Sequence, residues 1–342
     1  MNEKATRKFF VHIVIFAVVM LLTFWFVFRN QDISRTVAAV QKMSGEYLAA
    51  AFVLAVLFVS AEGCMIWYLL KGIGERTRFF RCISYSFIGF FFSGLTPSAT
   101  GGQPMQLYYM KRDKNSLSAS SVVLMSVALV YKLVLVLIGI GILLFWNAPL
   151  RRYLQEYYAL YFLGLFLNTA LVAVLLLVML SPGVIRGLFY RADNLFVRLR
   201  IWKPSGVRQE KMDRFLSGYQ GTVHFLKGNK RMMAVILIGT FLQRFLVFVL
   251  TYVVYRGLGL FGVHIFDIVF VQASVYIAVD MLPIPGAQGI TEAMYASVFG
   301  SIFTDRYLMA SMCITRGISF YALMGIGLLV FFAVNIRGKK VS

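Results

Sequence analysis

The stretch LTPSATGGQP, residues 95–104, interrupts a long apolar segment, and LPIPGAQG, residues 282–289, interrupts a second one in the same way. Proline and glycine at this density end a helix, because proline lacks a backbone donor and glycine lacks helix propensity. The interrupting residues are Pro97, Gly101 and Gly102 in the first stretch and Pro283, Pro285, Gly286 and Gly289 in the second. Each stretch therefore predicts two short helices joined by a break: a hairpin over 82–110 and another over 263–303.

The sequence around these breaks is that of a membrane protein. Of its 342 residues, 60% are hydrophobic and 14% are charged. A soluble domain averages roughly 45–50% apolar and about 25% charged residues, so the bilayer must solvate most of this chain. A helix that crosses a hydrocarbon core of about 30 Å needs roughly 20 apolar residues. Six segments meet that demand: 9–28, 47–70, 118–146, 157–180, 232–255 and 307–334.

Charged residues between the spans predict the topology. The loop 182–231 carries 11 Lys and Arg against three acids, which favours the cytoplasmic side. Its segment GLFYRADNLFVRLRIW suits a helix that lies on a membrane surface. Counting outward through six spans then puts both termini in the cytoplasm. For this count to close, each hairpin must return to the side from which it entered, so both are predicted to be re-entrant.

The two hairpins occupy matching places in the chain. One lies within 47–146 and the other within 232–334, each between two spans, and the predicted topology makes them enter from opposite faces. The sequence thus predicts a single all-α membrane domain whose halves form an inverted repeat, an arrangement in which transporters place their sites at the broken helices. The alternative is that both breaks are surface loops beside short amphipathic helices.

Ionisable residues inside the spans are the candidate site. A charge at the bilayer centre costs roughly 2.5–3.5 kcal/mol on insertion scales, so each needs a partner or a function. One interpretation is purely structural ion pairing. The other is a polar cavity in which cations hold a lipid phosphate, acids meet a cationic headgroup, and glutamines and glycine-rich helix starts add hydrogen bonds. The candidate headgroup residues are Lys132, Arg244, Arg316, Glu62, Asp280, Glu292, Gln103 and Gln288.

Several function classes lack their sequence motifs. The chain has no G-x-x-x-x-G-K-[ST] and no C-x-x-C, H-E-x-x-H or G-x-S-x-G, and its three histidines are scattered without metal-ligand spacing. We therefore assign no catalytic residue, metal or cofactor. The net charge of +20 arises from basic residues between spans, so membrane surface explains it better than nucleic acid.

At the two breaks, SGLTPSATGGQPMQLYYMKR (93–112) and LPIPGAQGITEA (282–293) resemble the lysylphosphatidylglycerol synthase transmembrane family. That family includes the membrane part of the bacterial multiple peptide resistance factor, and the resemblance covers about residues 9–334. Ala287 stands where such proteins usually carry a second glycine. The resemblance assigns importance to Pro97, Gly101, Gly102, Gln103, Pro285, Gly286, Gly289 and Glu292.

The resemblance implies lipid handling in a bacterial inner membrane. In full-length members the membrane part translocates aminoacylated phosphatidylglycerol, and a cytosolic domain transfers lysine from lysyl-tRNA. Because the sequence ends at Ser342, soon after the last span, we expect a stand-alone membrane module. The leading hypothesis is a flippase-like translocase of a phospholipid or polyprenyl-linked lipid. It uses no cofactor, its partners are membrane phospholipid and a separate lipid-modifying enzyme, and the sequence leaves room for a homo-oligomer.

Two rival functions remain open. The first is phosphatidylglycerol lysyltransferase, the activity in the family name, for which tRNA would be the one nucleic-acid partner. We lean against an enzyme, because the longest soluble segment has about 50 residues. The second is a secondary transporter of a soluble ion or metabolite, which the fold alone permits. A lateral opening toward lipid distinguishes the translocase from a solute carrier.

Overall fold

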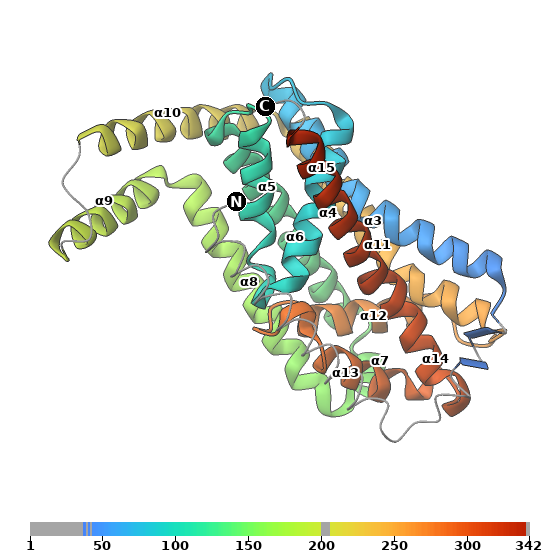
Figure 1. The fold of residues 1–342 in the computed structure, drawn as a ribbon. Helices are drawn as coiled ribbons and strands as arrows, with labels where there is room; N and C mark the ends of the chain where they lie inside the picture. Colours follow the sequence, from blue (N-terminus) through green and yellow to red (C-terminus); the bar gives the residue numbers. More distant parts are fainter. Residues whose placement is uncertain (1–36, 39, 42, 200–205, 340–342) are drawn as a thin grey trace.

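The computed structural model describes residues 43–199 and 206–339, together with 37, 38, 40 and 41. In this part of the chain every regular element is helical, and the long helices stand side by side in a bundle (Figure 1). The predicted all-α membrane fold is thereby confirmed. The first predicted span, 9–28, lies outside the described residues.

Five of the predicted spans are present within a few residues of their expected bounds. Within the described residues, five helical stretches are long and apolar enough to cross a bilayer. Four of them contain α3 (Gly45–Ile73), α6 (Leu117–Phe145), α8 (Tyr158–Leu180) and α11 (Lys230–Gly257). The fifth consists of α14 (Asp305–Arg316) and α15 (Leu323–Lys339), joined by a π-helical segment at Gly317–Ala322 that the hydrophobic pattern did not predict.

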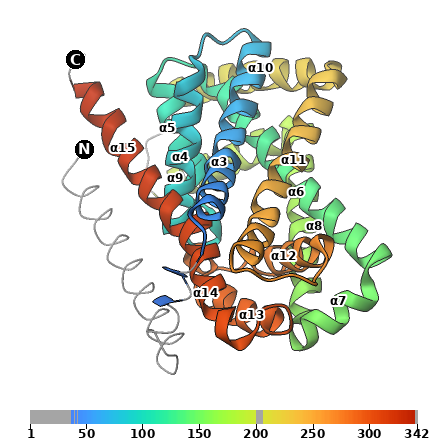
Figure 2. The same ribbon diagram turned by 90° about the vertical axis from the view of Figure 1, so that its right-hand side faces the viewer.

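Both predicted hairpins are broken helices. The first comprises α4 (Phe79–Leu95), the 3-10 turn η1 (Pro97–Ala99) and α5 (Gly102–Arg112); the second comprises α12 (Ile265–Val279), η3 (Pro285–Ala287) and α13 (Ile290–Val298). With 17 and 15 residues, α4 and α12 are too short to cross a bilayer. The α4–α5 pair lies toward one end of the bundle and the α12–α13 pair toward the other (Figure 2).

The remaining helices lie at the two ends of the bundle. At the α13 end, α7 (Asn147–Leu154) and η2 (Gln155–Tyr157) connect α6 to α8, and η4 (Phe299–Ser301) follows α13. At the other end, α9 (Pro182–Arg198) and α10 (Gly206–Gly228) project sideways from the bundle (Figure 1). The predicted surface helix is confirmed as a helix up to Arg198; residues 200–202 of that segment lie outside the described residues.

Glycines allow the hairpin helices to pack closely on the spans. Gly63 of α3 faces the backbone of Ile83 in α4, and Gly164 of α8 faces the carbonyl oxygen of Ile277 in α12. A Cβ at these two positions would lie 2.7 and 2.2 Å from those backbone atoms. Small residues permit this approach of helix backbones, which drives helix association in membranes.

We expect Gly164→Ala to destabilise the protein by at least about 3 kcal/mol, the upper end for overpacking, because the clashing atom belongs to the backbone and cannot rotate away. Gly141→Ala in α6 is the matched control, since a Cβ there meets no atom within 4 Å. Thermal unfolding in detergent should give a lower Tm for the first variant alone. Equal Tm values for both variants would contradict the close approach of α8 and α12.

Candidate functional site

The tips of the two hairpins have the same backbone conformation. At the first tip, Ser98 and Ala99 have φ angles of 50° and 56°; at the second, Gly286 and Ala287 have 58° and 48°. The residues before the two prolines also match, with φ and ψ of −118° and 144° at Thr96 and −117° and 131° at Ile284. One turn is therefore built twice, as an internal repeat would require.

Left-handed conformations carry strain except at glycine, at roughly 1–2 kcal/mol for each residue. Three of the four left-handed positions, Ser98, Ala99 and Ala287, are not glycine. Gly286 has a second constraint, since a Cβ there would lie 2.3 Å from the ring of Phe320. The tips are thus strained turns held by their surroundings, which is typical of functional sites.

The two tips contact each other. The η1 and η3 turns pack against each other, and Ser98 Oγ donates a hydrogen bond of 3.5 Å to the carbonyl oxygen of Leu282. Residues almost 200 positions apart in the sequence thus form one junction. The prediction that the breaks approach each other is therefore correct.

Arg316 and Glu292 hold the second tip in place. Arg316 Nε donates to Glu292 Oε1 at 2.8 Å, and Nη2 donates to the carbonyl oxygen of Gly286 at 3.2 Å. The other carboxylate oxygen of Glu292 accepts from the backbone N–H of Gly289 at 2.8 Å, which caps the start of α13. Both charged side chains are largely buried, so this pair serves the structure of the turn.

Lys132 and Asp280 form a second internal ion pair. Lys132 Nζ also lies 3.2 Å from Met281 Sδ, just before the second break. Asp280 Oδ1 accepts from the hydroxyl of Tyr131 at 3.3 Å, and this hydroxyl lies 3.2 Å from that of Tyr276. Two of the three predicted cations are thus neutralised by acids on a different helix, as the ion-pairing interpretation predicts.

Arg244 differs from the other two cations. Its side chain is 1% exposed, and within the described residues neither Nε nor Nη1 has a hydrogen-bond partner. The guanidinium lies over the ring of Tyr131 at 3.7 Å, with Phe58 at 4.8 Å and Tyr276 at 5.8 Å. An aromatic cage of this kind stabilises the cation through its ring faces but leaves the N–H groups without acceptors.

The glutamines near the breaks have different environments. Gln103 is exposed, whereas Gln106, one turn further along α5, donates to Glu62 Oε1 at 2.6 Å. Gln288 is 3% exposed, and within the described part of the chain its side-chain oxygen and nitrogen are both unpaired. Glu62 forms no ion pair with a described residue, although Arg244 lies within electrostatic range of it. The described residues therefore include a buried cation, Arg244, and a buried amide, Gln288, whose side-chain bonding capacity is unused, and an acid, Glu62, without an ion-pair partner.

A comparison with protein families matches residues 10–327 to the family described as the lysylphosphatidylglycerol synthase TM region. The match covers nearly the whole sequence, including both hairpins and every candidate site residue. The chain belongs to this family. A search of curated proteins finds no match.

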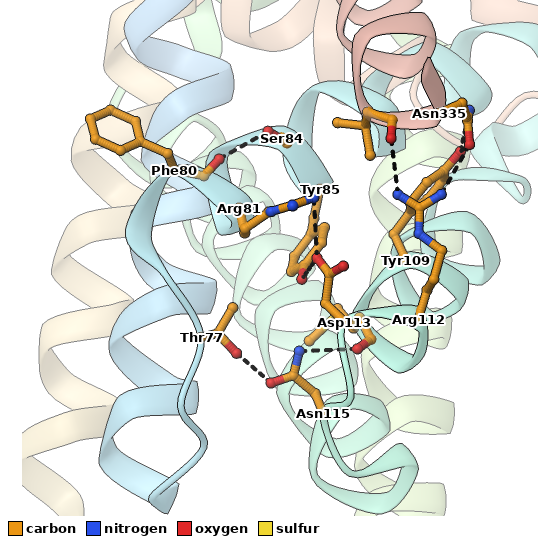
Figure 3. A network of polar contacts seen from close by, with 12 residues as sticks. Thr77, Phe80, Arg81, Ser84, Tyr85, Tyr109, Arg112, Asp113, Asn115 and Asn335 are labelled. Atoms are coloured by element: carbon orange, nitrogen blue, oxygen red, sulfur yellow. Dashed lines mark hydrogen bonds and ion pairs between the residues drawn. The ribbon is translucent and has the colours of Figure 1, made fainter. Parts of the chain in front are cut away.

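In this member of the lysylphosphatidylglycerol synthase TM family, a polar network fixes the outer end of the first hairpin (Figure 3). Asp113, just after α5, accepts from the hydroxyl of Tyr85 in α4 at 2.6 Å and lies 3.8 Å from Arg81. Arg112 and Tyr109 both donate to the side-chain oxygen of Asn335 in α15 at 3.0 Å. The polar end of α5 is thus tied to α4 and α15.

Sequence reasoning missed the residues that surround Arg244 and Glu62. Tyr131 lies in the middle of a span beside Lys132, and that position was the available signal. Gln106 was also missed, although it lies one helical turn after Gln103. Phe58 gave no signal, because an aromatic residue in an apolar span is usually a packing residue.

Proposed function

We propose that this family member is a flippase-like lipid translocase, and that Arg244 is the group that binds the lipid phosphate. The observation that carries the proposal is the buried guanidinium with two unpaired nitrogens. A buried donor without a partner costs about 1–3 kcal/mol, and more when it is charged. A phosphodiester supplies the missing acceptors, because its oxygens match the fork of a guanidinium bidentately.

Two other polar groups suit the rest of a headgroup. Glu62 offers a carboxylate without an ion-pair partner among the described residues, and Gln288 offers an unpaired amide. A headgroup with an ammonium group, such as aminoacylated phosphatidylglycerol, would use the acid and the guanidinium together. A polyprenyl-linked lipid would use the guanidinium and the amide. Lys132, Arg316, Asp280 and Glu292 then act by holding the junction in shape.

The proposed transport mechanism is alternating access between the halves 47–146 and 232–334. The strained turns and the junction of η1 with η3 support it, since two packed turns provide an interface that can open toward either face. In the described structure Arg244 is enclosed, which fits an occluded state. We place the α5 and α9–α10 end in the cytoplasm of a bacterial inner membrane because Lys and Arg gather there.

The purified protein in liposomes tests this function. The liposomes contain a phosphatidylglycerol analogue with a headgroup amine, and an impermeant amine reagent is added outside. Translocation should bring analogue molecules from the inner leaflet to the outer leaflet, where the reagent labels them. We expect complete labelling with the protein and labelling of about half, the outer leaflet, in protein-free liposomes. If the labelled fraction of the amine-bearing lipid stays at the protein-free level, the proposal is overturned.

The family description makes phosphatidylglycerol lysyltransferase the alternative activity. The same preparation distinguishes the two functions when lysyl-tRNA and phosphatidylglycerol are supplied and the lipids are analysed by mass spectrometry. Formation of lysylphosphatidylglycerol without headgroup movement supports the transferase. Headgroup movement without a new lipid supports the translocase.

A further inference from the structure

The α9–α10 arm has an outward face that the candidate site does not use. Arg191, Leu195 and Arg198 lie at positions i, i+4 and i+7 of α9 and so share one face, which Leu199, the C-cap residue, continues. All four are exposed, Leu195 by 54% and Leu199 by 58%. At this spacing the two arginines lie along one edge of the face and the two leucines along the other. We call these four residues the α9 stripe.

The acids of α9 and α10 form ion pairs with arginines of the same two helices. Asp193, which is buried, accepts from Arg208 Nε at 2.8 Å, and Asp213 lies 3.2 Å from Arg186. The third acid of the arm, Glu210, pairs with Arg214. Every acid of α9 and α10 is therefore used within the arm. Neither Arg191 nor Arg198 has an ion-pair partner among the described residues, so no described acid neutralises their charge.

The arm is fixed rigidly to the bundle. Ser118 at the start of α6 donates to the carbonyl oxygen of Phe215 at 3.0 Å, and Tyr219 lies 3.3 Å from Met125. Burial raises the pKa of Tyr219, so its hydroxyl stays neutral and available as a donor. The segment of α10 around Phe215 and Tyr219 is thus attached to α6, the span that contains Lys132.

The direction of the α9 stripe follows from the order of the layers. In both views α10 lies at the outer end of the molecule and α9 lies on the side of the spans (Figures 1 and 2). The ion pairs of Asp193 and Arg186 turn one face of α9 toward α10, and the α9 stripe lies on the opposite face. The α9 stripe is therefore directed toward the plane at which the spans leave the bilayer.

We propose that the α9 stripe is a contact surface for an anionic phospholipid leaflet, with the leucines at the acyl-chain boundary and both arginines on lipid phosphates. Amphipathic helices bind anionic interfaces in this way. Each basic side chain near such a surface contributes about a fivefold preference for anionic lipid, so two contribute roughly thirtyfold. This inference is independent of translocation, because it rests on residues outside the junction of the hairpins.

Site-directed spin labelling of the full-length protein in nanodiscs tests the surface. A nitroxide at Leu195→Cys, in a background with Cys64, Cys82 and Cys313 replaced by alanine, reports access to a water-soluble paramagnetic agent. We expect several-fold lower access in nanodiscs with equimolar phosphatidylglycerol than in pure phosphatidylcholine. A label at Gly221→Cys, an exposed position of α10 where a Cβ meets no atom within 4 Å, should stay accessible in both.

Adding Arg191→Ala and Arg198→Ala should abolish the lipid dependence of the Leu195→Cys label while the Tm is unchanged. The proposal is overturned if the label is equally accessible in both lipids. Equal protection in both lipids overturns it as well, because the arginines would then select nothing. A lipid dependence that survives the double alanine variant also contradicts it.

Discussion

Arg244→Met is expected to reduce headgroup translocation by at least about tenfold while the protein remains as stable as the wild type. Loss of a charge-assisted contact to phosphate costs about 1.5–3 kcal/mol, and 1.4 kcal/mol corresponds to a factor of ten. The stability should hold because two nitrogens of Arg244 have no partner in the described structure. Replacing a buried charge by an apolar residue of similar volume is often neutral or stabilising.

Arg256→Met is the matched control for this variant. Arg256 belongs to the same helix, α11, but lies in its last turn over the ring of Phe261, away from the junction. Translocation in proteoliposomes and thermal unfolding in detergent should be measured on the same preparations. If Arg244→Met instead unfolds at a much lower temperature and retains wild-type transport, Arg244 is a packing residue and the proposed phosphate site is wrong.

The sequence predicted the spans well because their signal is local. A run of apolar residues long enough to cross the bilayer has few alternatives, since every backbone group in lipid must be bonded within a helix. The breaks at Pro97 and Pro285 were also predictable from a local signal, because proline and glycine at high density end a helix. The π-helical segment at Gly317–Ala322 was not, because it leaves the hydrophobic pattern of the span unchanged.

The pairing of the charged residues could not be predicted from the sequence. Three cations and three acids allow several pairings, and the choice depends on how the helices are rotated in the bundle. The structure pairs Lys132 with Asp280 and Arg316 with Glu292, and it surrounds Arg244 with rings instead. The ion-pairing interpretation therefore applies to Lys132 and Arg316, and Arg244 is the cation for which we propose a headgroup role.

Arg316→Met is expected to destabilise the protein by about 3–5 kcal/mol, because it leaves Glu292 as a buried, unpaired carboxylate. It also removes the donor to the Gly286 carbonyl, which holds a left-handed turn. Thermal or denaturant unfolding in detergent checks this effect. Arg244→Met is expected to lose transport at unchanged stability, whereas Arg316→Met is expected to lose stability.

The double variant Arg316→Met, Glu292→Leu separates the two causes of this loss. With both charges removed, the penalty for an unpaired buried carboxylate disappears, and most of the stability should return. What does not return measures the bonds to the backbone of Gly286 and Gly289, which no apolar residue can replace. If Arg316→Met alone is as stable as the wild type, Glu292 must pair with another cation in that variant. In that case Arg316 would be free to bind a headgroup, and the division between structural and ligand-binding cations would have to be redrawn.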